Sequence, residues 1–212
     1  MTIYLLPGVG CDARLFERLD LAGFDVVMLA WPAFEAKDSL AAIAHRLLSS
    51  VRTDEPHVLV GVSMGGMVAQ ELAVLTNPQK VVLISSWTGP HEWPRHVRFG
   101  ARFGVHRVIR EWTMRAAWPV KRVMDPREGA VDRLLWDMAM KQSARQLRNG
   151  TAAIMRWNGS PWKGPVVRIH GDKDIVTPLR FPVDHVVKSG QHVMVLTKAE
   201  EVSQLLVRCL RS

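Results

Sequence analysis

The stretch Gly61-Val62-Ser63-Met64-Gly65-Gly66 decides the fold of this chain. It follows an apolar run, His-Val-Leu-Val at residues 57–60, and precedes a helix-like segment, Met-Val-Ala-Gln-Glu-Leu-Ala at residues 67–73. Because glycine has no Cβ, the outer glycines let a strand and a helix approach closely around a tight turn. A plain flexible turn is the alternative interpretation, but the flanking segments favour a strand, a sharp turn and a helix. We expect the Ser63 hydroxyl to project above the end of a sheet, beside the unpaired N–H groups of a helix N-terminus.

The C-terminal third contains the two partners that would activate such a serine. A serine hydroxyl is a weak nucleophile until a base takes its proton, and a histidine held by a carboxylate can act as that base. A strand is predicted over residues 165–170 and runs into a loop at 171–178, the end of a strand where α/β sheets place their functional groups. A short strand at 185–188 leads into the loop Ser189-Gly190-Gln191-His192, and a helix is predicted from about 198 to 209.

Four motifs in this order resemble those of the α/β-hydrolases. The segment Val60–Gly66 resembles the nucleophile elbow, and His170–Asp174 resembles the acid loop. Gly190-Gln191-His192 resembles the loop that carries the catalytic histidine. Leu6–Gly10 follows the first strand and resembles the oxyanion loop, with proline where the family has histidine. The resemblance covers residues 1–87 and 163–212 and implies the fold of that family.

The resemblance also implies a role for each motif. Ser63 is the expected nucleophile, Asp174 the acid and His192 the base, in the chain order that this fold uses. The backbone N–H groups of Val9 and Met64 are the expected oxyanion donors, and two such donors lower the barrier by several kcal/mol. No metal and no organic cofactor are expected, because no His, Cys or carboxylate cluster has ligand spacing.

Two residues of the acid loop leave alternatives open. Spacing alone allows Asp172 to replace Asp174 as the acid. His170 lies at the end of the preceding strand, and we interpret it as structural rather than as the base. The remaining histidines are interpreted as surface or capping residues, because a lone histidine without a partner is rarely catalytic.

The alternation of strands and helices predicts the fold class α/β, with a mostly parallel sheet of about six strands and helices on both faces. The predicted strands are Ile3–Leu6, Asp25–Ala30, Val58–Val62, Lys80–Ser85, Val166–His170 and Val186–Lys188. Ser39 is expected to cap a helix over about residues 40–51. Larger α/β-hydrolases begin with two further strands, so the resemblance implies a compact form that lacks this antiparallel pair.

The alternation stops between residues 88 and 162, where no strand-like run is found. Helical patterns cover about residues 95–103, 105–117, 127–142 and 144–157, punctuated by prolines. We therefore predict an α/β-hydrolase core at 1–87 and 163–212, with an inserted helical cap at 88–162. Residues 88–157 contain 14 Lys or Arg and 6 Asp or Glu. The formal charge of this segment is therefore +8, the same as the net charge of the whole chain.

Three interpretations of the cationic cap compete. The first is a solvated surface without a specific partner, and the second is a surface that steers anionic substrates to the site. The third is a binding surface for nucleic acid or an anionic membrane. No nucleic-acid motif is present and the basic residues are spread over several helices, so we expect no nucleic-acid partner. Five tryptophans and five methionines of the cap are expected to form its core, with some of them lining an apolar acyl pocket.

Composition agrees with one large core. The chain has 212 residues, of which 48% are hydrophobic. No apolar run approaches the roughly 20 residues needed to span a bilayer, and the N-terminus does not resemble a signal peptide, so we expect a cytoplasmic protein. The two cysteines, Cys11 and Cys209, do not imply a disulfide framework.

The hypothesis from sequence is a serine hydrolase that cleaves carboxylic esters through an acyl-enzyme intermediate. The substrate would be a small ester with an apolar acyl chain or an anionic group. Thioesters, amides and lactones are alternatives, because the same triad hydrolyses them. A small-ligand receptor or sensor with little turnover is the alternative from a different class. The oligomeric state stays open.

Overall fold

The computed structural model describes residues 1–116 and 129–211. Its strands form one six-stranded sheet in the order β2-β1-β3-β4-β5-β6, and every neighbouring pair is parallel. The predicted α/β class with a parallel sheet is therefore confirmed. The strands are β1 (Thr2–Leu6), β2 (Asp25–Met28), β3 (His57–Val62), β4 (Lys80–Ile84), β5 (Val166–Gly171) and β6 (His185–Val187).

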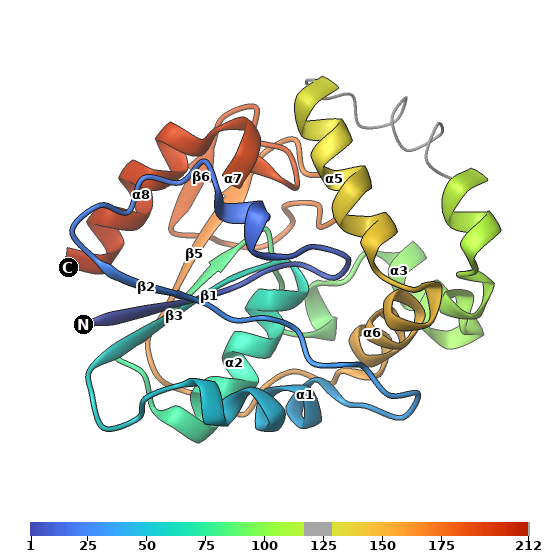
Figure 1. Cartoon of the computed structure of the whole chain (residues 1–212), viewed down its shortest axis with the longest axis horizontal. Coiled ribbons are helices and arrows are strands. Elements are labelled where there is room, and N and C mark those ends of the chain that lie inside the picture. The colour runs from blue at the N-terminus through green and yellow to red at the C-terminus, as the bar shows by residue number, and fades with distance from the viewer. Residues whose placement is uncertain (117–128, 212) are drawn as a thin grey trace.

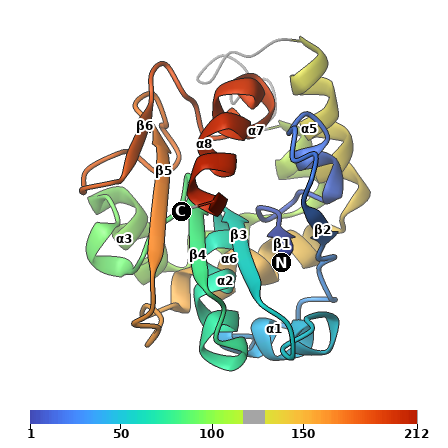
Figure 2. The same cartoon turned by 90° about the vertical axis from the view of Figure 1, so that its left-hand side faces the viewer.

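Helices cover both faces of the sheet (Figures 1 and 2). Side chains alternate between the faces along a strand, so Ile3 and Leu5 of β1 join one hydrophobic cluster while Tyr4 and Leu6 join the other. The first cluster is completed by the short helix η1 (Ala13–Phe16), α7 (Met194–Thr197) and α8 (Ala199–Arg211). The second is completed by α1 (Leu40–Leu47) and α2 (Met64–Thr76).

Every regular element that the structure describes between β4 and β5 is a helix or a 3-10 turn. It contains η3 (Pro90–Glu92), α3 (Arg95–Phe103), η4 (Val105–Val108), a helical stretch at 111–116, α5 (Gly129–Lys141) and α6 (Ala144–Arg156). Leu135 and Met138 of α5 pack into the first cluster, and Ala153 of α6 packs into the second. This segment thus shares its apolar interior with the sheet, and its boundaries as a separate cap stay a prediction.

The helix predicted over residues 105–117 is interrupted in its described part. A 3-10 turn ends at Val108, and a new helical stretch begins at residue 111. The Thr113 hydroxyl accepts a hydrogen bond from the Arg110 N–H at 2.8 Å and lies 2.8 Å from the Val108 carbonyl, to which it donates. These bonds satisfy backbone groups that a continuous helix would pair along its own axis. Residue 117 and the start of the helix predicted at 127–142 lie outside the described residues.

Other predicted boundaries differ by a few residues. The helix predicted at 40–51 ends at Leu47 and continues as the 3-10 turn η2 (Leu48–Ser50), while its predicted Ser39 cap is confirmed by a 3.0 Å bond from the Ala42 N–H. The strand predicted at 25–30 ends at Met28, and α7 was not predicted. Within the described ranges, no helix combines the length and the apolar composition needed to cross a bilayer.

Candidate active site

Ser63 occupies the sharp turn between β3 and α2, as the sequence predicts. Its φ of 55° and ψ of −122° are unusual for a residue with a side chain and store backbone strain. The surrounding backbone holds this conformation: the Ser63 N–H donates to the Ile84 carbonyl at 3.0 Å, and the Ser63 carbonyl accepts from the Ser86 hydroxyl at 2.7 Å. These two bonds fasten the turn to the carboxyl end of the neighbouring strand β4.

The glycines on either side of Ser63 are required by contact distances. A Cβ on Gly61 would lie 2.3 Å from the carbonyl carbon of Gly65, and a Cβ on Gly65 would lie 2.1 Å from the Leu6 carbonyl oxygen. Both neighbours are backbone atoms, which cannot move without shifting a strand or a helix. The Gly-x-Ser-x-Gly spacing thus lets the end of β1 pack directly on the N-terminal turn of α2.

Asp174 and His192 lie together, in hydrogen-bond contact. The His192 Nδ1 is 2.9 Å from Asp174 Oδ2 and 3.1 Å from Oδ1. The buried carboxylate also accepts bonds from the Val176 N–H at 2.9 Å, the Thr177 N–H at 2.8 Å and the Thr177 hydroxyl at 2.6 Å. Burial acts to raise the pKa of Asp174, but His192 and Thr177 outweigh it and hold that pKa at about 2.

The alternative acid in this loop has a different environment. Asp172 is exposed, and its backbone N–H donates to the Val187 carbonyl at 3.3 Å. The structure therefore places Asp174, and not Asp172, against His192.

His170 is buried behind the acid loop. Its Nε2 is 2.6 Å from the Thr177 carbonyl, which can only accept, so Nε2 carries the proton. Burial lowers the pKa of His170 and favours the neutral ring, while the Thr177 and Asp174 oxygens oppose this effect. The geometry agrees with its interpretation as a structural residue that fixes the loop around Asp174.

The acid loop and the histidine loop are in backbone contact. A Cβ on Gly171 would lie 2.1 Å from the Gly190 carbonyl oxygen, and the Lys173 N–H donates to that same oxygen at 2.9 Å. This close approach fixes the position of Asp174 relative to His192, since each lies within a few residues of the contact.

Ser63 and His192 line one cavity of about 320 Å³. The described lining contains no Asp, Glu, Lys or Arg, and apart from the histidine and the serine it is largely aliphatic. Leu135 and Ala139 of α5 and Leu147 of α6 form one wall, so the helical segment closes the site. No tryptophan or methionine is among the described lining residues. The described aliphatic side chains of the cavity are leucine, valine and alanine. Trp118 and Met124 lie outside the described residues, so the expected acyl pocket stays a prediction.

Both expected oxyanion donors lie near Ser63: Met64 is the next residue in the chain, and Val9 lies close in space. Met64 is the first residue of α2, so its N–H has no acceptor within the helix. Val9 lines the same cavity as Ser63, on the loop that follows β1. This loop is held by the Gly8 carbonyl, which accepts bonds from the Cys11 N–H at 3.1 Å and the Trp31 indole N–H at 3.2 Å. Their role as oxyanion donors stays a prediction.

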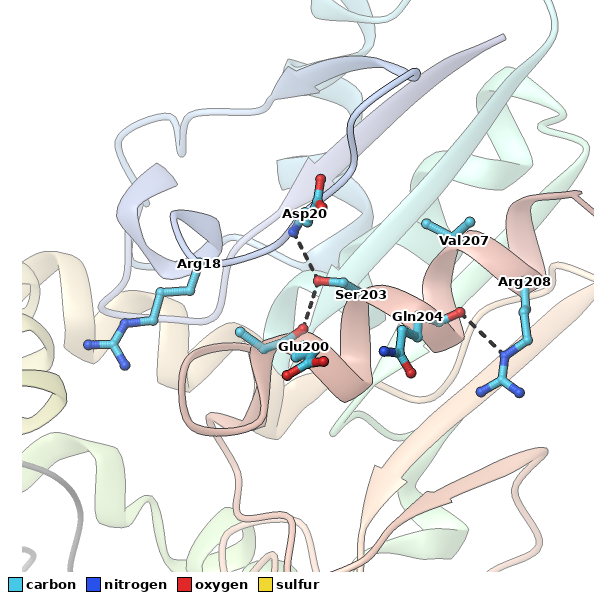
Figure 3. A pocket seen from close by; sticks show the side chains of 8 residues that line it. Arg18, Asp20, Glu200, Ser203, Gln204, Val207 and Arg208 are labelled. Atoms are coloured by element: carbon cyan, nitrogen blue, oxygen red, sulfur yellow. Dashed lines mark hydrogen bonds between the residues drawn. The ribbon is translucent and has the colours of Figure 1, made fainter.

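A larger cavity, of about 890 Å³, lies between the loop after η1 and helix α8 (Figure 3). Ser203 lines it, but its hydroxyl accepts from the Asp20 N–H at 2.9 Å and donates to the Ala199 carbonyl at 2.7 Å. None of the described lining residues is a histidine, so the described lining holds no imidazole that could activate that serine. The size of a cavity alone therefore does not identify the active site.

Across residues 1–116 and 129–211, no group of three or more His, Cys, Asp or Glu could hold a metal ion.

Comparison with known proteins identifies the family of this chain. The sequence model of the alpha/beta hydrolase family matches residues 3–205. The chain belongs to this family. No curated protein matches the sequence.

Solved structures show the same fold at low sequence identity. A thermophilic esterase from Thermogutta terrifontis superposes with a TM-score of 0.78 at 16% identity, covering 100% of this chain and 89% of that chain. The esterase EaEST from Exiguobacterium antarcticum gives 0.78 at 15%, covering 100% and 92%. An enol-lactonase from Burkholderia xenovorans LB400 gives 0.77 at 17%, covering 100% and 91%.

Proposed function

We propose that this protein is a serine hydrolase that cleaves carboxylic esters through an acyl-enzyme intermediate, with Ser63, Asp174 and His192 as its catalytic residues. The observation that carries the proposal is the pairing of His192 with a buried, charged Asp174 on a cavity that also contains Ser63. Membership of a hydrolase family and a fold shared with esterases support it. The cytoplasm stays the expected location.

The mechanism follows from this arrangement. The Ser63 oxygen attacks the ester carbonyl carbon while His192 takes the hydroxyl proton at Nε2. Asp174 holds the proton on Nδ1, which leaves Nε2 free as the base, and then stabilises the imidazolium. The N–H groups of Val9 and Met64 would bind the oxyanion. His192 returns the proton to the leaving alcohol, and water attacks the acyl-enzyme with the same histidine as base.

The cavity favours a neutral acyl group of modest size. Its volume of about 320 Å³ is near the lower end of small-molecule sites, and none of its described lining residues offers a charged partner to an anion. A charged acyl group would lose its hydration without compensation, which is costly. We therefore propose short to medium aliphatic esters as substrates. Lactones are the next candidate class, because the same attack opens a cyclic ester and one structural neighbour is an enol-lactonase.

The first test concerns Ser63. A fluorophosphonate probe should label the wild type and fail to label Ser63→Ala, and hydrolysis of p-nitrophenyl esters should fall by several orders of magnitude. Ser203→Ala is the matched control, because Ser203 lines the other cavity and contacts no described histidine. Equal labelling of wild type and Ser63→Ala would refute the assignment. Labelling of Ser63 without turnover of any ester or lactone would favour the alternative function, a small-ligand receptor or sensor.

The second test separates the two aspartates of the acid loop. Asp174→Asn should lower kcat by roughly a thousand-fold or more, because the amide no longer enforces the histidine tautomer. Asp172→Asn should change kcat by less than about three-fold, since the side chain is exposed and away from His192. Both variants are compared with wild type on one p-nitrophenyl ester after a thermal unfolding check. A greater loss in Asp172→Asn would overturn the proposed triad.

A further inference from the structure

Helix α3 presents its aromatic side chains to solvent. The helix packs inward through small residues: Gly100 is buried, while Val97 and Ala101 are half-buried. The residues at positions 95, 98, 99, 102 and 103 are exposed, and their spacing places them along one helical face. Their sequence is Arg, Arg, Phe, Arg, Phe. A helix that only covers the protein's own core normally has a polar outer face, so two exposed phenylalanines on this face are unusual.

The exposed apolar surface continues beyond α3. Phe99 and Phe103 are 61% and 60% exposed, and their ring centroids are 4.3 Å apart. Val108, after α3, is 60% exposed and Trp112 is 68% exposed. Among the described residues, every phenylalanine or tryptophan counted as exposed lies between positions 95 and 116. We call the exposed side chains of residues 95–116 the docking face.

The docking face is strongly cationic. Residues 95–116 contain six arginines and one acidic residue, Glu111. The Glu111 carboxylate accepts a bond from the Ala144 N–H at 2.8 Å, so it caps the start of α6. Arg98 bonds to the carbonyls of His91 and Trp93, and the five other arginines of this segment are exposed. Aromatic rings interleaved with arginine are the composition of surfaces that rest in the headgroup region of a membrane.

We propose that the docking face binds the surface of an anionic lipid bilayer, with Phe99, Phe103, Val108 and Trp112 entering the interface and the arginines pairing with lipid phosphates. Charge complementarity identifies the partner: the arginines match anionic headgroups, and the apolar side chains gain by leaving water. The exposed Val108 favours lipid over a nucleic acid, because an aliphatic side chain offers bases neither a stacking surface nor a hydrogen bond. The protein would rest on the bilayer rather than cross it.

The position of the docking face connects it to the cavity. Helix α3 and the turn η4 both pack on α6, as Figure 1 shows for α3, and α6 contributes Leu147 to the cavity wall. A bilayer seated on the docking face would lie against the helical layer that closes the site. Lipid binding itself does not depend on the proposed esterase activity, so the two proposals fail separately.

The test is cosedimentation of the full-length protein with vesicles. Vesicles of equal parts phosphatidylcholine and phosphatidylglycerol should bind the protein, and phosphatidylcholine alone should bind it at least about ten-fold more weakly. Arg95→Glu/Arg102→Glu should weaken binding to the anionic vesicles by roughly 25-fold or more, since each arginine near the surface contributes about five-fold. Phe99→Ser/Phe103→Ser should weaken it by roughly ten-fold or more.

Matched control variants lie on α8 and α2, outside the docking face. Arg208→Glu/Arg211→Glu changes the same charge on α8, and Val74→Ser/Leu75→Ser removes exposed apolar residues of α2. Both controls should bind anionic vesicles as the wild type does. Vesicles with brominated acyl chains should quench wild-type tryptophan fluorescence more than that of Trp112→Phe. Thermal unfolding of each variant checks that it is folded.

Four results would overturn the proposal. Equal binding to both vesicle types would show that the protein has no preference for anionic lipid. A loss of binding in the α8 or α2 controls as large as that in the docking-face variants would show that the docking face is not the binding surface. A single-stranded oligonucleotide that binds more tightly than the vesicles, and that loses affinity in the same variants, would make nucleic acid the partner. A dimer in solution that dissociates in Phe99→Ser/Phe103→Ser would make a second copy of the chain the occupant.

Discussion

Asp174 shows how a buried carboxylate can stay charged in this fold. Burial alone would favour the protonated form, since a charge loses its hydration in the interior. Three donors from Val176 and Thr177, together with His192, replace that hydration with fixed hydrogen bonds. The charge is therefore available to orient the imidazole at neutral pH. The same bonds make the folded state depend on the charge of this one carboxylate.

The stability of the protein should consequently fall in acid. The folded pKa of Asp174 is about 2 and its ordinary value is 3.8, so the unfolded chain takes up the proton first as pH falls. The contribution of this carboxylate is present above about pH 4 and is lost as pH falls toward about 2, and it amounts to about 2 kcal/mol. Urea unfolding from pH 5 to pH 2 should show wild type losing about 2 kcal/mol more than Asp174→Asn. Asp172→Asn should keep the wild-type pH slope, and a parallel decline in Asp174→Asn would contradict the prediction.

At the scale of elements, the elbow depends on the packing of β1 against the first turn of α2. Gly65→Ala would place a methyl group 2.1 Å from the Leu6 carbonyl and 2.4 Å from that of Pro7. We expect a loss of about 2–3 kcal/mol in unfolding free energy, because both neighbours are backbone. Gly129→Ala is the control, since the one described neighbour of its new methyl group is the end of the Arg133 side chain, at 3.6 Å. Thermal denaturation should show a lower Tm for Gly65→Ala alone, and equal Tm values would contradict the tight contact.

The sequence predicted best the elements whose burial follows from a continuous run of apolar residues. Six strands were predicted because runs such as Val81-Val82-Leu83-Ile84 are buried on both faces of a parallel sheet. The interruption of the helix predicted at 105–117 was missed because it depends on one hydroxyl, that of Thr113, bonding to the backbone before it. The choice between Asp174 and Asp172 also needed coordinates, since spacing does not say which carboxylate faces the histidine loop.

The lining of the cavity was the part of the site that sequence could predict least. Leu135, Ala139 and Leu147 come from two helices whose mutual packing is not visible in a hydrophobic pattern. Three of the side chains that suggested an acyl pocket lie elsewhere: Met138 and Trp157 lie in the two hydrophobic clusters, and Trp112 is exposed to solvent. A large apolar residue predicts burial or contact, but the pattern alone does not show which.

At the scale of the whole molecule, the net charge and the cavity are separated. The segment 88–157 carries a formal charge equal to the +8 of the whole chain, while the described lining of the cavity has no Lys or Arg. An external cationic field raises the local concentration of an anionic ester but offers it no charged partner inside. Steering should therefore affect the encounter of enzyme and ester, and the cavity should decide which acyl group reacts.

This separation predicts how salt should affect substrate choice. For a matched pair of short esters, one neutral and one with an anionic acyl group, the neutral ester should have a kcat/KM higher by roughly ten-fold or more at 0.15 M salt. The gap should narrow at 0.01 M, because the screening length grows from about 8 Å to about 30 Å and the cationic surface then attracts the anion from further away. The neutral ester itself should change little with salt. Initial rates for both esters at the two ionic strengths check this, with Arg95→Glu/Arg102→Glu expected to show a smaller salt effect on the anionic ester. A preference for the anionic ester at 0.15 M would mean that an arginine reaches the acyl group, because only a partner within the site resists that screening.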